Sequence, residues 1–131
     1  MKNSFLLDTQ AIIWYFNGSN NLDKQLAEEI SNPENAVFVS RISFWEISIK
    51  AALGKLRLSS NLETLMFQCQ QAGFVILGLE NEHILMLEQL HSHHRDPFDR
   101  ILIAQCMAEE LEIISSDATL DAYPIIRKWK D

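Results

Sequence analysis

The sequence predicts an α/β domain, a three-layer α/β/α sandwich with a mostly parallel central sheet of four to five strands. Short, continuous apolar runs of strand length alternate along the chain with segments of helical periodicity. Strands that are separated by helices form parallel sheets, and the helices cover both faces. The length of 131 residues suits one domain spanning residues 1–131, because such a chain buries roughly two-thirds of its unfolded surface.

The expected strands are short, apolar and rich in β-branched or aromatic residues. The first run ends at an acid, the second is continuously apolar, and the last is a short edge strand in the C-terminal tail. They are predicted at residues 4–7, 36–40, 74–79, 112–115 and within 124–129.

The expected helices show apolar residues at helical spacing and end at Gly or before Pro. Asp96 and Pro97 form a typical helix start, with an N-cap acid and proline at the first helical position. Residues 91–95 are predicted to form a polar loop. The helices are predicted at residues 9–16, 22–30, 42–53, 61–72, 81–90 and 97–110.

Composition narrows the class of protein. The formal net charge is −7, with 47% hydrophobic and 22% charged residues, which excludes a disordered chain. No apolar run approaches the roughly 18 residues of a membrane span, and Asp8 comes too early for a signal peptide. Cys69 and Cys106 lack C-x-x-C spacing and are expected to be reduced and structural. A cytoplasmic location is therefore expected, and the acidity argues against general nucleic-acid affinity.

Four acids follow strands or begin helices at the carboxyl edge of the predicted sheet. Asp8 follows the first strand, Glu46 lies in the helix after the second, Asp99 begins the long helix, and Asp117 follows the fourth strand. Ligands of parallel sheets bind at this edge. Clustered carboxylates repel one another unless a cation joins them. Oxygen ligands favour Mg²⁺ or Mn²⁺, which would promote phosphodiester hydrolysis by lowering the pKa of an attacking water.

Each acid taken singly also has a structural interpretation. Asp8 and Asp117 have the positions of helix N-caps, and so does Asp96. The stretch from Ser43 to Glu46 fits a capping box.

Four stretches of the chain resemble PIN-domain proteins, and more closely the VapC-type toxins of bacterial toxin–antitoxin pairs. The stretches are Leu-Leu-Asp-Thr at 6–9, Ser-Phe-Trp-Glu-Ile-Ser-Ile-Lys at 43–50 with Gly-Lys-Leu at 54–56, His-Arg-Asp-Pro-Phe-Asp-Arg-Ile-Leu-Ile-Ala-Gln at 94–105, and Ile-Ser-Ser-Asp at 114–117. The resemblance implies a PIN-like fold and a metal-dependent endoribonuclease. It implies that Asp8, Glu46, Asp99 and Asp117 hold one or two Mg²⁺ or Mn²⁺ ions and cleave RNA.

Two hydroxyl side chains beside these acids, Thr9 and Ser115, are expected to support them; Ser115 stands where Thr is common in the family. The resemblance also implies a cognate antitoxin as partner and a homodimer, with no membrane association.

Basic residues are concentrated where they would form a rim for RNA phosphates around the acidic pocket; a solvated helix face is the alternative interpretation. The expected RNA-binding residues are Lys50, Lys55, Arg57, Arg95 and Arg100. Residues 59–94 contain four acids and no Lys or Arg. The acidic, partly apolar segment 61–90 is therefore expected to receive a basic or amphipathic partner.

Other residues are assigned mainly to structure. A zinc site is one interpretation of the three histidines His91, His93 and His94, but solvated side chains in a loop are the favoured interpretation. Trp14, Trp45 and the aliphatic residues of 101–107 are expected in the core, although Trp45 has the alternative of stacking on a base.

Two other functions are alternatives. The first is a phosphoacceptor receiver-like signalling domain, although Thr9 and Gln10 follow Asp8 where a receiver has a second acid. The second is a catalytically idle PIN domain that acts as a binding module. A Rossmann nucleotide-binding domain is excluded because no G-x-G-x-x-G follows the first strand.

Overall fold

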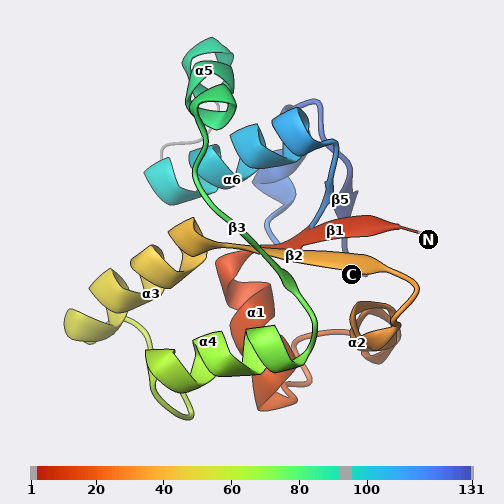
Figure 1. The fold of residues 1–131 in the computed structure, drawn as a ribbon, viewed down its shortest axis with the longest axis vertical. Helices are drawn as coiled ribbons and strands as arrows, with labels where there is room; N and C mark the ends of the chain where they lie inside the picture. The colour runs from red at the N-terminus through yellow and green to blue at the C-terminus, as the bar shows by residue number, and fades with distance from the viewer. Residues whose placement is uncertain (1–2, 92–95, 131) are drawn as a thin grey trace.

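Five strands form one sheet in the computed structural model, which describes residues 3–91 and 96–130. The order across the sheet is β3-β2-β1-β4-β5, and every strand pair among the described residues is parallel (Figure 1). The strands are β1 (Ser4–Leu7), β2 (Ala36–Ser40), β3 (Val75–Leu77), β4 (Glu112–Ile114) and β5 (Arg127–Lys128). Each lies within a predicted strand, so the predicted parallel sheet is confirmed.

Six α-helices in the described residues correspond to the six predicted helices. They are α1 (Thr9–Asn17), α2 (Lys24–Ser31), α3 (Arg41–Ala52), α4 (Leu62–Gln71), α5 (Asn81–Gln89) and α6 (Pro97–Glu109). None within this part of the chain is long and apolar enough to cross a membrane.

Two local features differ from the prediction. Helix α2 begins two residues late because the Asp23 carboxylate accepts hydrogen bonds from the backbone N–H groups of Gln25 and Leu26, which fixes the helix start. A 3₁₀ helix, η1 (Ala118–Ala122), follows β4, where no element was predicted.

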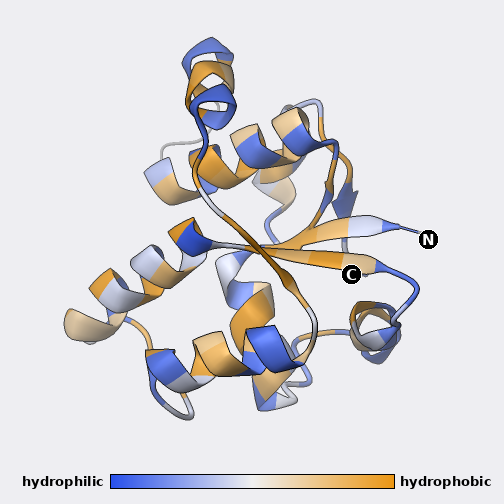
Figure 2. Ribbon diagram, in the orientation of Figure 1, coloured by the Kyte–Doolittle hydropathy of each residue, from blue (hydrophilic) through white to orange (hydrophobic). Residues whose placement is uncertain are grey.

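Successive side chains of β1 point to opposite faces of the sheet and are buried in two different cores. Phe5 and Leu7 pack with residues of α1, α2, α3 and α4, whereas Leu6 packs with α6 and η1. All three side chains are fully buried. The strands at the centre are correspondingly apolar (Figure 2). The three-layer α/β/α sandwich is therefore confirmed.

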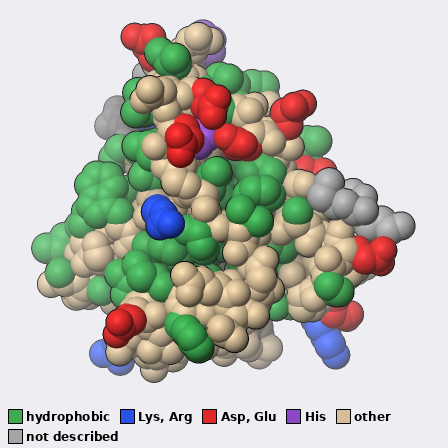
Figure 3. Space-filling view, viewed as in Figure 1, with side chains coloured by type: hydrophobic (Ala, Val, Ile, Leu, Met, Phe, Trp, Pro, Cys, Tyr) green, Lys and Arg blue, Asp and Glu red, His purple; other side chains and the backbone are tan. Residues whose placement is uncertain are grey.

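The prediction that Trp45 is a core residue was wrong. Its neighbours Phe44 and Glu46 are buried, but the Trp45 side chain is 54% exposed. Its ring packs edge-on against the Phe98 ring, with 5.2 Å between the ring centroids. The Trp45 side chain lines a groove between α3 and α4. Hydrophobic side chains are exposed on the face of the molecule that Figure 3 shows. Trp14 is partly buried against Trp129, with ring centroids 5.8 Å apart.

Buried positions elsewhere follow the prediction. Leu102, Ile103 and Cys106 of α6 are buried, and both cysteines are free thiols. Burial raises the pKa of Cys69 to about 11 and that of Cys106 further, so both thiols are neutral at physiological pH.

The chain changes direction across the sheet at β1. From β1 it builds outward through β2 and β3, and it then returns to the other side of β1 with β4 and β5. The carboxyl ends of β1 and β4 therefore lie side by side, and the Asp8 N–H donates to the Ile114 carbonyl at 3.1 Å. Ligands of open parallel sheets bind at such a switch point.

Two isoleucines near the β4–β5 pair provide a test of this core. Ile113 is fully buried, whereas Ile126 is 64% exposed. We expect Ile113→Ala to lower the free energy of unfolding by about 2–5 kcal/mol, because it leaves a cavity. The matched change Ile126→Ala should cost less than about 0.5 kcal/mol. Urea denaturation measures both, and equal effects would contradict the assignment of Ile113 to the core.

Candidate active site

The structure brings the four predicted acids together. Asp8, Glu46, Asp99 and Asp117 line one pocket of about 200 Å³, although they come from separate parts of the chain. The other residues that line it are Thr9, Gln10, Lys50, Leu56, Asp96 and Ser116. The pocket lies at the carboxyl ends of β1 and β4, as the strand-end argument predicted.

Asp8 stands at the centre of this arrangement. It is the N-cap of α1, and its Oδ1 accepts a hydrogen bond from the Ala11 N–H at 2.8 Å. Burial raises the pKa of Asp8 to about 6, opposed by hydrogen bonds from Ser115 and Ala11 and reinforced by the negative charges of Glu46 and Asp117. Burial is therefore the main cause of the raised pKa, and repulsion from the other two acids makes a smaller contribution.

Glu46 is buried in α3 and both of its carboxylate oxygens are engaged. Thr9 Oγ1 lies 2.5 Å from Oε1, and Lys50 Nζ lies 2.5 Å from Oε2. Thr9 Oγ1 is also 3.0 Å from Ser43 Oγ. A hydroxyl carries one proton, so Thr9 donates to the carboxylate while Ser43 donates to Thr9. A role for Ser43 in this network was not predicted, although Ser43 lies three residues before Glu46 in the family-like stretch 43–50.

The capping-box interpretation of Ser43 and Glu46 was wrong. Helix α3 begins at Arg41, and its N-cap is Ser40, whose hydroxyl accepts from the Ile42 N–H at 3.1 Å. Glu46 therefore lies beyond the first turn of α3, and its position is explained by Thr9 and Lys50 rather than by capping.

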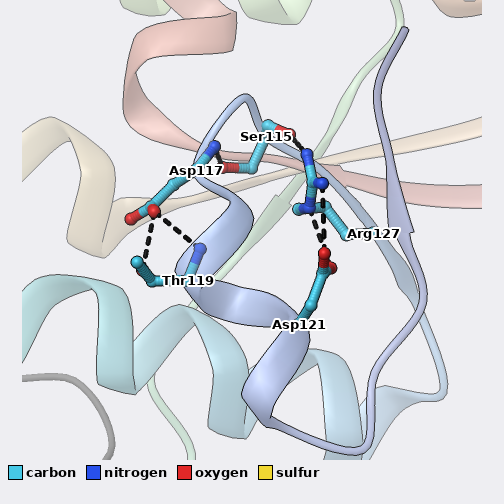
Figure 4. A network of polar contacts seen from close by, with 5 residues as sticks. All are labelled: Ser115, Asp117, Thr119, Asp121 and Arg127. Carbon is cyan, nitrogen blue, oxygen red and sulfur yellow. Dashed lines mark hydrogen bonds and ion pairs between the residues drawn. The ribbon is translucent and has the colours of Figure 1, made fainter. Parts of the chain in front are cut away.

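Asp117 is held in the turn between β4 and η1 (Figure 4). Its N–H donates to Ser115 Oγ at 3.1 Å, and its Oδ1 accepts from the backbone N–H and the hydroxyl of Thr119 at 3.0 and 2.6 Å. Ser115 is buried and contacts both Asp8 and Asp117. The expected supporting positions of Thr9 and Ser115 thus lie against three of the four acids.

Arg127 of β5 holds the turn between β4 and η1 by hydrogen bonds and an ion pair. Its guanidinium donates to the Ser115 carbonyl at 3.0 Å and to both carboxylate oxygens of Asp121 at 2.9 and 3.1 Å. The guanidinium lowers the pKa of Asp121 below its ordinary value. This network is invisible to sequence motifs because it joins the edge strand to η1 (Figure 4).

Asp96 and Asp99 enter the pocket from the start of α6. Asp96 is the predicted N-cap, and its Oδ1 accepts from the N–H groups of Phe98 and Asp99 at 2.9 and 3.3 Å. It also lines the pocket as a fifth carboxylate, which the capping interpretation did not anticipate.

The predicted basic rim is partly assembled. Lys50 lines the pocket in an ion pair with Glu46. Lys55 and Arg57 are exposed on either side of the pocket-lining Leu56. Arg100 donates to the His91 carbonyl at 3.0 Å, and Arg95 lies outside the described residues.

The histidines of the 91–95 loop do not form a described metal centre. His91 is exposed, and His93 and His94 lie outside the described residues. Within residues 3–91 and 96–130, one group of His, Cys, Asp and Glu side chains brings three ligand atoms within 4.8 Å of one another, and it consists of Glu82, His83 and Glu109. There, His83 Nδ1 accepts from the Glu80 N–H at 3.0 Å, so Nε2 carries the proton and faces Glu109 at 2.8 Å. Both ring nitrogens are used in structural bonds, which argues against a metal at this place.

The oxygen atoms of the carboxylate pocket are of the type that hard divalent cations prefer. Its charged groups are five carboxylates and one ammonium, and Thr9, Gln10 and Ser116 add neutral side-chain oxygen atoms. Oxygen donors of this kind suit Mg²⁺ or Mn²⁺. Burial and repulsion from the other acids raise the pKa of Asp8 because they disfavour its charged form. A bound cation would offset both effects.

Solved structures share the whole fold. The chain is 12% identical to a protein in the structure of VapBC2 from Rickettsia felis bound to a promoter DNA fragment, with a TM-score of 0.74 and coverage of 97% of this chain and 99% of that one. It is 14% identical to a chain of DNA-bound VapBC from Salmonella typhimurium, with a TM-score of 0.66 and coverage of 96% and 97%. For FitAcB from Neisseria gonorrhoeae the identity is 20%, the TM-score 0.65 and the coverage 94% and 95%.

None of the curated protein sequences matches the chain. The family model described as PIN domain matches residues 5–126, a span that contains all four acids and both supporting hydroxyls. The chain therefore belongs to the PIN domain family.

Proposed function

We propose that this protein is a Mg²⁺- or Mn²⁺-dependent endoribonuclease and the VapC-type toxin of a toxin–antitoxin pair. The observation that carries the proposal is the convergence of Asp8, Glu46, Asp99 and Asp117 in one pocket at the switch point of the sheet. PIN family membership and the similarity to VapBC and FitAcB chains support it. The receiver-like alternative has no comparable support.

The four acids would hold the metal ion. When bound, the ion would neutralise charge on the phosphodiester and lower the pKa of an attacking water. Thr9 and Ser115 keep Glu46 and Asp8 in place by hydrogen bonding, so the carboxylates are oriented before substrate arrives. Lys55 and Arg57, exposed beside the pocket, would bind RNA phosphates outside the cleavage point.

Activity tests the proposal directly. Asp8→Asn and Glu46→Gln should each lower the rate of RNA cleavage about 100-fold or more, because each removes a metal-binding charge while keeping the side-chain shape. Glu63→Gln, the same change at an exposed position of α4, is the matched control and should retain the wild-type rate. Purified protein freed of any partner is assayed on RNA with Mg²⁺ or Mn²⁺, then with EDTA.

Three outcomes would count against this assignment. Undiminished cleavage by Asp8→Asn would remove Asp8 from the site, and cleavage that survives EDTA would remove the metal. RNA binding without cleavage by the wild-type protein would favour the idle binding module instead.

The raised pKa of Asp8 predicts a pH dependence of stability in metal-free protein. The pKa is about 6 in the folded protein and 3.8 in its ordinary state. The folded state therefore binds more protons between these values, and the stability contributed by protonated Asp8 is lost as the pH rises through 6. The free energy of unfolding of Asp8→Asn, relative to that of the wild type, should therefore increase by about 1–3 kcal/mol as the pH rises from about 4 to about 7.

Urea denaturation in EDTA at several pH values measures this difference. A difference between the two proteins that stays constant with pH would contradict the assigned cause. Mn²⁺ should stabilise the wild type more than Asp8→Asn at neutral pH, because the metal needs the ionised carboxylate.

We also infer a protein partner of the antitoxin kind for the face beside the pocket. A groove of about 390 Å³ between α3 and α4 is lined mainly by apolar side chains, including Trp45 and Met66, and its one charged lining residue in the described part of the chain is Arg41. Phe67 of α4 is 58% exposed beside it. An apolar segment of a partner would fill this groove. The homodimer also remains a proposal, which the oligomeric state of the isolated chain would test.

Co-expression with the product of the neighbouring reading frame tests the partner. Met66→Glu should reduce co-purification of that product at least tenfold, because it places a charge in the apolar groove. Ile126→Glu, at an exposed position on β5's side of the molecule, is the control and should leave co-purification unchanged. Equal retention by both variants would place the partner elsewhere.

A further inference from the structure

A single ammonium group lies among the carboxylates of the candidate active site. Lys50 is the one cation among the residues that line the described pocket. Its Nζ lies 2.5 Å from Glu46 Oε2, and the exposed fractions of the two side chains are 36% and 5%. Lys50 is predicted from sequence to lie on a basic rim that binds RNA phosphates, whereas in the structure its side chain points to a buried acid.

The position of Lys50 is set by more than its i,i+4 spacing from Glu46. The hydrogen bond to Glu46 raises the pKa of Lys50, and the negative charges of Glu46, Asp96 and Asp99 add to the effect. The ammonium therefore responds to acids of both α3 and the start of α6. Glu46 Oε1 receives only a neutral hydroxyl, from Thr9, so Lys50 supplies the positive charge that the buried Glu46 requires.

The Glu46 carboxylate cannot keep its ion pair with Lys50 and bind a metal ion with both oxygens at the same time. A divalent cation contacts carboxylate oxygens at about 2.0–2.2 Å, and it repels an ammonium group held on the same carboxylate. The Lys50 side chain is long, flexible and one-third exposed, so its ammonium can leave Glu46 for solvent without movement of α3.

We propose that Lys50 is a displaceable counter-ion, which neutralises Glu46 in the metal-free protein and leaves this carboxylate when a divalent cation enters the pocket. The inference rests on the proposed function, because it assumes that the pocket binds the metal. Lys50 thereby acts as a positioning residue for the acids of the pocket until metal binds. It sets a threshold for metal loading, because each binding event must break its ion pair.

Calorimetric titration with Mn²⁺ alone at about pH 8 tests this inference, since the acids are ionised there. Lys50→Met should lower the Kd for Mn²⁺ about tenfold, because a competing charge-assisted hydrogen bond is removed. Lys24→Met makes the same charge change at an exposed residue of α2 outside the pocket and should alter the Kd less than about twofold. Without metal, Lys50→Met should melt at a lower temperature than wild type, and saturating Mn²⁺ should close the gap.

The outcomes separate this inference from the proposed function. If wild-type protein does not bind Mn²⁺, the proposed metal site fails and the inference fails with it. If wild type binds Mn²⁺ and Lys50→Met binds no more tightly than Lys24→Met, the inference alone is overturned. Should Lys50→Met not fold, Lys50→Gln retains a hydrogen-bond donor for Glu46 without the charge, and the same comparison with Lys24→Met decides.

Discussion

Repulsion among carboxylates at the carboxyl edge of the sheet is the constraint on which the site depends. The parallel sheet forces the ends of β1 and β4 together, so Asp8 and Asp117 are brought close by topology alone. The neighbouring residues offset the cost: Ser115 hydrogen-bonds to Asp8, while Thr9 and Lys50 engage Glu46. These contacts come from α1, α3 and the turn after β4, and the fold must be complete before they form.

Helix capping and a position in the acidic pocket are not competing interpretations. Asp8, Asp96 and Asp117 each cap a helix and also line the pocket. A cap restricts the rotamer of its carboxylate by bonding it to the first backbone N–H groups of the helix. The backbone therefore orients these acids before any ligand arrives, which is the preorganisation that a binding site requires. The sequence pattern is the same for both roles, so capping geometry alone is no argument against function.

The elements and the four acids were predictable because their signals are local. Apolar runs bounded by Gly, Pro and acids mark the strands and helices, and the acids stand where those elements meet. The partners of the acids were not predictable in the same way. Three features depend on how α3 is rotated against α1 and α6. They are the pairing of Lys50 with Glu46 rather than with solvent, the contact between Ser43 and Thr9, and the exposure of Trp45. Such rotation is decided by packing of the whole core, which periodicity does not specify.

The acidity of the chain is compatible with action on a nucleic acid once its distribution is considered. Five carboxylates and one ammonium meet in the pocket, and the segment 59–90 adds acids without a Lys or Arg. Under the proposed function, a phosphodiester would be repelled by this pocket, so a bound cation would serve substrate binding as well as chemistry. Exposed Lys55 and Arg57 supply only a small basic rim. Under the proposed function, affinity for RNA is therefore governed by metal occupancy, and the acidic surface is left for a positively charged partner.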